Sequence, residues 1–205
     1  MKPHEKTVSV GGLCRPAVLS RATVAVLVVV ACYSFADEQT QEGYSPYVDA
    51  KGNISLPKDY ETTFVHIGTV AVEKESGDPV TELHGAYTRR GDLEAFKRDG
   101  KFPDGAVLVK DVRSVTNEKL TTGAASYGSE IKVWFVMIKD AKGRFAGNDI
   151  WGDGWGWGLF EGGDRSKQVA SDYKSECRAC HVPAQRTEWV YTKCYPELAP
   201  KAKAQ

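Results

Sequence analysis

The sequence predicts an α+β fold in which a mainly antiparallel β-sheet carries a few short helices. Several strand-like segments rich in β-branched residues precede one late helix, and strands and helices do not alternate as they do in parallel α/β folds. The chain has 205 residues, of which 41% are hydrophobic, and this is enough to bury the core of one globular domain. Because the formal net charge is zero and no basic run is interleaved with aromatic residues, nucleic acid is not an expected partner.

Residues 1–36 have the composition of an export signal peptide. Basic residues precede an apolar run at 22–32, and "SFADE" offers a cleavage site after Ala36. The apolar run is too short to favour a membrane-spanning helix, which needs about 20 residues. Two alternatives stay open, an uncleaved anchor and a lipoprotein leader that ends before Cys32, because "VVAC" resembles a bacterial lipobox. We therefore expect a periplasmic protein that is membrane-bound only if it is lipidated or keeps its leader.

Two strands are predicted near the start of the folded domain. Residues 37–56 are polar and turn-rich, which indicates a linker that leads into a domain at 57–200. The segment 61–73 alternates in polarity and is rich in β-branched residues, so it is predicted to be a strand. A second strand is predicted at 82–90.

A short helix and the two clearest strands follow. The helix is predicted at 91–100, where Asp92 suits the N-cap and a closing glycine suits the C-terminus. The strands are predicted at 105–115 and 130–140, and 121–129 between them is predicted to be a loop.

The last third of the domain has a less regular pattern. Residues 148–164 are rich in glycine and tryptophan and show no periodicity, which indicates an irregular loop anchored by its aromatic side chains. The segment 171–181 is predicted to be a helix that Ser171 or Asp172 caps and that Pro183 stops.

This late helix carries the sequence "CRACH", which is the attachment signature of c-type haem. The thiols of Cys177 and Cys180 are one helical turn apart and can form thioether bonds to the two vinyl groups on one edge of a porphyrin. The imidazole of His181 then lies under the iron as its axial ligand. The motif therefore predicts one covalently attached haem c.

Three other uses of these cysteines compete with haem attachment. A redox dithiol lacks the expected strand–helix–strand context, a zinc site that adds Cys194 lacks a second ligand pair, and a surface disulfide is the third alternative. The exported domain would keep an odd number of cysteines, which is explained if haem consumes two of them. Cys194 is then either a small buried hydrophobe or an intermolecular partner.

Few residues remain that could bind the iron on its other side. His66 and His84 are the only other imidazoles outside the predicted leader, and Met137 is the only thioether besides the initiator. Met137 lies inside an apolar strand, and a strand histidine such as His66 is by default structural. An open or weakly occupied iron position is therefore favoured over a pure electron carrier.

Lys110 is unusual because of its position in a strand. Residues 106, 108, 110 and 112 share one face of the segment 105–115, and this lysine is the only polar residue among them. The side chain either extends to solvent at the strand end or points into the haem pocket, where desolvation would lower the pKa of its amine.

The segments "LPKDY", "FPDGAVLVKDV", "WFVMIKDAKGRF", "WGDGWGWGLFEGGD" and "CRACHVPAQRTEWVY" together resemble the cytochrome P-460 family. That family includes hydroxylamine-oxidising cytochromes P-460 and gas-binding cytochromes c′-beta. The resemblance extends from about residue 55 to the C-terminus and implies an antiparallel β domain, a homodimer and a five-coordinate haem. It also implies a role for Lys110, because in cytochromes P-460 the lysine of this stretch is bonded to a meso carbon of the porphyrin.

The resemblance is incomplete at one position that matters for chemistry. Hydroxylamine-oxidising members have a pocket carboxylate on the strand after the lysine strand, whereas 130–140 has only apolar residues in its interior. Among these we expect Phe135 to contact the haem. Removing protons from hydroxylamine needs a base, for which His84 is the candidate, although it is equally well explained as a structural residue. An apolar lining would instead suit nitric oxide or carbon monoxide.

The sequence thus predicts an exported monohaem c-type cytochrome that acts on small nitrogen species, with oxidation of hydroxylamine or nitric oxide at an open iron position. The first alternative is a non-catalytic cytochrome that binds nitric oxide or carbon monoxide. The second is simple electron transfer to a partner cytochrome.

Overall fold

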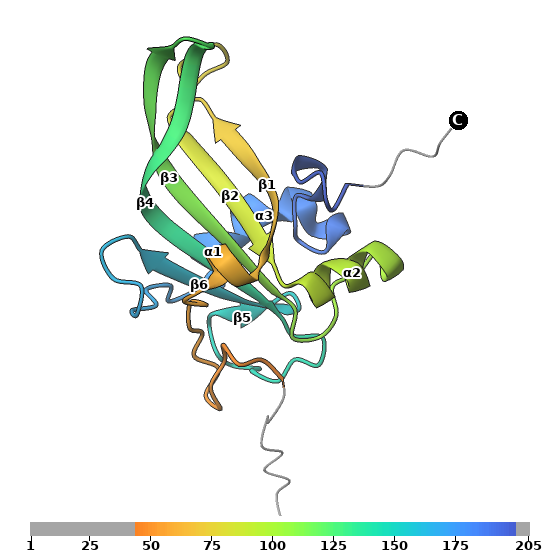
Figure 1. The fold of residues 1–205 in the computed structure, drawn as a ribbon. Coiled ribbons are helices and arrows are strands. Elements are labelled where there is room, and N and C mark those ends of the chain that lie inside the picture. Colours follow the sequence, from red (N-terminus) through yellow and green to blue (C-terminus); the bar gives the residue numbers. More distant parts are fainter. Residues whose placement is uncertain (1–43, 200–205) are drawn as a thin grey trace, which may run out of the picture. The chain divides into compact units, whose positions relative to one another are not determined.

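The structure, a computed structural model, describes residues 44–199, which fold around a six-stranded antiparallel sheet (Figure 1). The strand order is β1–β2–β3–β4–β6–β5. The strands are β1 (Val65–Val72), β2 (Glu82–Thr88), β3 (Val107–Leu120), β4 (Gly123–Lys139), β5 (Trp151–Gly152) and β6 (Trp155–Glu161). The helices are α1 (Tyr60–Thr63), α2 (Arg90–Asp99), η1 (Lys174–Arg178), α3 (Ala179–His181), η2 (Val182–Thr187) and η3 (Thr192–Cys194). The predicted α+β class with an antiparallel sheet is confirmed, while the predicted leader lies outside the described residues.

The two faces of the sheet support two separate hydrophobic cores. On one face, Leu108 and Met137 pack with residues of α2 and of the C-terminal segment. On the other face, Val109 and Val136 pack with Tyr60 of α1 and with residues before it. Figure 1 shows α1 in front of the sheet and the C-terminal helices, drawn in blue, behind it. Alternate residues of each central strand therefore belong to different cores, as the strand period of two requires.

Two predictions near the start of the domain need correction. The predicted strand at 61–73 begins later, because residues 61–63 belong to α1 and the hydroxyls of Thr62 and Thr63 bond back to the carbonyl of Asp59. Asp92 is not the N-cap of α2 but lies in its first turn, where its buried carboxylate accepts hydrogen bonds from the side chain of Arg89 and the backbone N–H of Val107. The described part of the predicted linker, 44–56, packs against the sheet.

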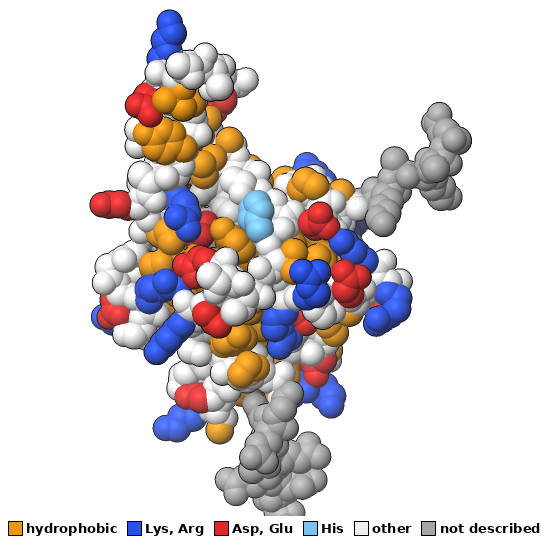
Figure 2. Space-filling view, in the orientation of Figure 1, with side chains coloured by type: hydrophobic (Ala, Val, Ile, Leu, Met, Phe, Trp, Pro, Cys, Tyr) orange, Lys and Arg blue, Asp and Glu red, His pale blue; other side chains and the backbone are white. Residues whose placement is uncertain are grey.

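The β3–β4 hairpin is much longer than predicted. Most of the predicted loop 121–129 is strand, since β4 begins at Gly123 and Tyr127 pairs with Thr116. The hairpin projects beyond the neighbouring strands (Figure 1), and hydrophobic side chains are visible on it in the space-filling view (Figure 2). Leu120 and Tyr127 are each 43% exposed.

The C-terminal part is also more regular than predicted. Residues 148–164 contain β5 and β6, so the prediction of an irregular loop is wrong. Asp172 accepts the N–H of Lys174 at 2.9 Å, as a capping residue does. α3 ends at His181, two residues before Pro183, as predicted, and the chain then continues as the 3-10 helix η2, whose first turn contains this proline. Among the described residues, no helix is long and apolar enough to cross a membrane.

Candidate functional site

A largely apolar cavity of about 340 Å³ separates the central strands from the C-terminal helices. Its wall includes Ala86, Leu108, Lys110, Phe135, Met137 and Trp157 from the sheet, and Glu176, Cys177, Cys180, His181, Tyr191 and Tyr195 from the C-terminal segment. Lys110, Phe135 and the three residues of the cysteine–histidine motif therefore line one space, although up to 71 positions separate them in the chain.

The helix that carries the two cysteines begins with a π-helical turn, η1, and continues into α3. Cys177 is half-buried and Cys180 is exposed, and neither forms a disulfide. Burial, with a smaller contribution from the charge of Glu176, raises the pKa of the Cys177 thiol to about 11. Within the described residues, no three His, Cys, Asp or Glu side chains gather into a metal site, so the alternative zinc site with Cys194 is not assembled.

His181 presents one ring nitrogen to the cavity. Its Nδ1 lies 2.7 Å from the carbonyl oxygen of Trp189, and because a carbonyl only accepts, Nδ1 carries the proton. The unprotonated Nε2 is then the nitrogen available to bind iron. Burial lowers the pKa of His181, which favours the neutral ring that a metal ligand requires. The ring of Trp157 lies edge-on to the imidazole, with centroids 4.8 Å apart.

Lys110 lines the cavity instead of extending to solvent. It pairs with Ala86 on β2 and with Phe135 on β4, and its Nζ lies 4.4 Å from the centroid of the Phe135 ring. Within the described residues the amine makes no hydrogen bond or ion pair. Burial lowers the pKa of the amine, because the uncharged form loses less on leaving water.

The histidines named as candidate ligands or bases lie elsewhere. His84 is on the cavity face of β2 but does not line the cavity, and its Nε2 lies 3.0 Å from Oε2 of Glu82. His66 is exposed and contacts Thr69. Met137 does line the cavity, through the apolar interior of β4.

Three polar residues of the cavity wall were not anticipated. Tyr191 donates its hydroxyl to the carbonyl of Cys180, and burial raises the pKa of Tyr195 to about 12. Glu176 is the only carboxylate among the lining residues, and its two oxygens accept the N–H and the hydroxyl of Ser171. The aromatic character of the last segment was visible in the sequence, but the turn that brings its tyrosines to the cavity was not.

An antiparallel sheet that faces a cysteine–histidine helix across an apolar cavity is an arrangement that can hold a haem. The family model described as Cytochrome P460 matches residues 57–192, which is more than half of the chain, and the protein belongs to this family. No curated protein matches the sequence. The family implies a haem cofactor, and the wall fits one, because apolar side chains, two free thiols and a neutral imidazole face the same space.

Proposed function

We propose that the protein is exported, attaches one haem c through Cys177 and Cys180, and binds nitric oxide or carbon monoxide at an open iron position. The observation that supports gas binding is that, among the described lining residues and apart from the proposed iron ligand His181, there is no free carboxylate or imidazole base. Both carboxylate oxygens of Glu176 accept hydrogen bonds from Ser171, and His84 does not line the cavity. A neutral diatomic ligand needs no base, whereas oxidation of hydroxylamine requires removal of N–H and O–H protons.

The chain's own residues have distinct roles in this proposal. The two thiols would form the thioether bonds, and Nε2 of His181 would bind the iron. The carbonyl of Trp189 keeps the imidazole in the required tautomer, and Phe135 and Met137 exclude water from the cavity. When bound, the haem supplies an iron to which a diatomic molecule can add.

Oxidation of hydroxylamine is the second candidate, and Lys110 is the observation that favours it. Its amine is the one basic group in the cavity without a polar partner in the described chain, and burial lowers its pKa. Such an amine can accept a proton from hydroxylamine, and the family resemblance implies that this lysine is bonded to the porphyrin. Electrons would then pass to a partner cytochrome.

Absorption spectroscopy and turnover separate the two candidates. Gas binding predicts an ordinary five-coordinate ferrous spectrum, saturation by nitric oxide and carbon monoxide, and no turnover of hydroxylamine with an artificial acceptor. A red-shifted Soret band together with steady hydroxylamine turnover would reject gas binding as the function and establish the second candidate. A six-coordinate low-spin spectrum would reject both.

Haem attachment is tested by replacing single cysteines. Cys177→Ser and Cys180→Ser should each leave a single thioether bond, which the pyridine haemochrome spectrum detects as one unsaturated vinyl group. Cys194→Ser is the matched control, because Cys194 does not line the cavity, and it should leave the spectrum unchanged. Export is tested on protein from the periplasm, whose N-terminus should be Asp37, or a lipidated Cys32 if the lipoprotein alternative holds.

A further inference from the structure

Backbone strain is concentrated next to the proposed iron ligand. Glu188 (φ 61°) and Trp189 (φ 64°) are consecutive residues in the left-handed region. In the described part of the chain only one other non-glycine residue, Asp153 (φ 55°), has a positive φ. Each such residue costs about 1–2 kcal/mol, so this pair persists only if its surroundings hold it in place.

The strained pair directs one carbonyl group at His181. The turn folds back on η2, because the N–H of Trp189 bonds to the carbonyl of Ala184 at 2.9 Å. The carbonyl of Trp189 then accepts the hydrogen bond from Nδ1 of His181. If residues 188–189 relaxed to ordinary negative φ, this carbonyl would point elsewhere and the imidazole would lose its acceptor.

Two ion pairs contact the turn. Nζ of Lys139 lies 2.7 Å from Oε2 of Glu188, and the two side chains are only 14% and 23% exposed. In the second pair, Nε of Arg178 lies 2.9 Å from Oδ2 of Asp153, and the guanidinium of Arg178 lies 5.5 Å from the centroid of the Trp189 ring. All three strained residues therefore belong to one cluster around the turn.

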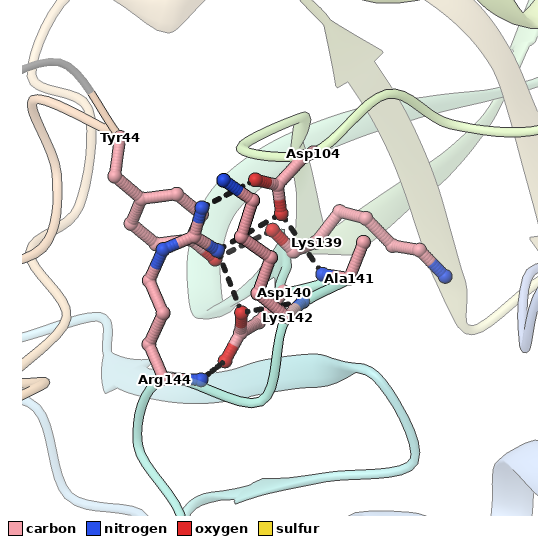
Figure 3. A network of polar contacts seen from close by, with 7 residues as sticks. All are labelled: Tyr44, Asp104, Lys139, Asp140, Ala141, Lys142 and Arg144. Carbon is pink, nitrogen blue, oxygen red and sulfur yellow. Dashed lines mark hydrogen bonds and ion pairs between the residues drawn. The ribbon is translucent and has the colours of Figure 1, made fainter.

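Lys139 is itself well anchored. It is the last residue of β4, and its carbonyl accepts the hydroxyl of Tyr44 and the N–H of Gly105. Figure 3 shows its side chain leading away from the charged cluster around Arg144. The lysine amine that pairs with Glu188 therefore extends from a strand end whose backbone is itself held by hydrogen bonds.

We propose that the Lys139–Glu188 ion pair is a brace that keeps residues 188–189 left-handed and so sets the strength of the hydrogen bond from His181 to Trp189. Lys139 and Glu188 are positioning residues, since neither lines the cavity. A strong bond at Nδ1 makes the imidazole a better electron donor to a metal at Nε2, so the brace tunes the iron. The tuning of iron rests on the proposed haem function, whereas the brace itself does not.

The test uses the haem-loaded protein and its Fe–His stretching band in the ferrous resonance Raman spectrum. Glu188→Gln and Lys139→Gln should each move the band to lower frequency and raise the midpoint potential. The double variant should show the shift of one single variant, because both remove the same interaction. Lys139→Arg should restore the wild-type band, since it keeps the charge and the reach.

Glu61→Gln is the matched control, because it removes an ion pair with Arg165 at 3.4 Å on the opposite face of the sheet. The brace is refuted if Glu188→Gln and Lys139→Gln lower the thermal stability but leave the band at its wild-type frequency, or if Glu61→Gln shifts the band equally.

A nuclear magnetic resonance measurement tests the brace independently of the proposed haem function. In protein prepared without haem, the Nδ1–H proton of His181 should exchange slowly with water in the wild type and at least tenfold faster in Glu188→Gln. A wild-type protein that attaches no haem would overturn the proposed function, yet this exchange measurement would still decide the brace. Equal exchange in the two proteins would overturn the brace even if haem is attached.

Discussion

Replacing Arg144 with glutamine should destabilise the protein by about 3 kcal/mol. Arg144 lies in the turn that follows β4, where its guanidinium contacts the carboxylates of Asp104 and Asp140 and covers the ring of Tyr44 at 4.0 Å (Figure 3). Asp140 is only 4% exposed, so a charged hydrogen bond there contributes about 1.5–3 kcal/mol. The partly exposed pair with Asp104 adds about 0.2–1 kcal/mol, and the aromatic contact about 0.5–1 kcal/mol.

Urea unfolding followed by circular dichroism measures this loss. Arg98→Gln is the control, because Arg98 and its partner Asp99 are 69% and 50% exposed, and this variant should unfold at the wild-type urea concentration. A loss of stability below about 1 kcal/mol in Arg144→Gln would refute the conclusion that the contacts of Arg144 contribute strongly to the free energy of unfolding.

The same variant makes a prediction about pH. The hydrogen bonds and charge of Arg144 lower the pKa of Asp104 below its usual value. A carboxylate whose pKa is depressed in the folded state stabilises the protein above its unfolded pKa of about 3.9, and that stabilisation disappears as the pH falls through the folded value. The stability difference between wild type and Arg144→Gln should therefore be constant near pH 7 and shrink below about pH 4. A difference that grows on acidification would contradict this linkage.

Three further predictions follow from packing, thiol chemistry and assembly. Gly152→Ala should cost about 1–3 kcal/mol in urea unfolding, because its Cβ would lie 2.1 Å from the ring of Tyr173, whereas Gly163→Ala, with nothing within 4 Å, should cost far less. In protein prepared without haem, iodoacetamide at pH 8 should modify exposed Cys180 at least tenfold faster than Cys177, whose pKa is raised to about 11, and equal rates by mass spectrometry would be inconsistent with that burial. Light scattering of the purified protein should give the mass of a homodimer, and a monomer at micromolar concentration would reject the expected assembly.

The sequence predicted strands well where β-branched and aromatic residues are concentrated between turn signals. Residues 105–115 and 130–140 were found for this reason, although both faces of these strands are buried. β6 was missed because most of its residues are buried on both faces, which removes alternation, and because its glycines make room for large neighbours. Gly156, for example, lies against the ring of Trp151, where a Cβ would come within 2.6 Å. The outer half of the β3–β4 hairpin was missed for the opposite reason, since both its faces are exposed.

The candidate site was predicted in the same uneven way. The thiols and His181 were named from a local motif, and the inward direction of Lys110 was one of two alternatives that periodicity left open. His84 does lie on the cavity face of the sheet, but the position of the cavity along the strand depends on register, which the sequence does not contain. The turn at Glu188 and Trp189 could not be predicted from the sequence, because neither residue is of a type that favours positive φ.

The strand period of two explains why the cavity contains a lysine without a counter-ion. Asp111 is the next residue after Lys110, yet it points to the opposite face, where Oδ2 accepts hydrogen bonds from Tyr60 at 2.8 Å and Arg113 at 2.9 Å. The carboxylate is thus neutralised in the other core, and the lysine amine is left against Phe135. A shift of one residue in β3 would place the carboxylate in the cavity and the amine among the tyrosines. The chemistry available to a bound haem is therefore set by the register of β3, because that register decides which of two adjacent charges the cavity contains.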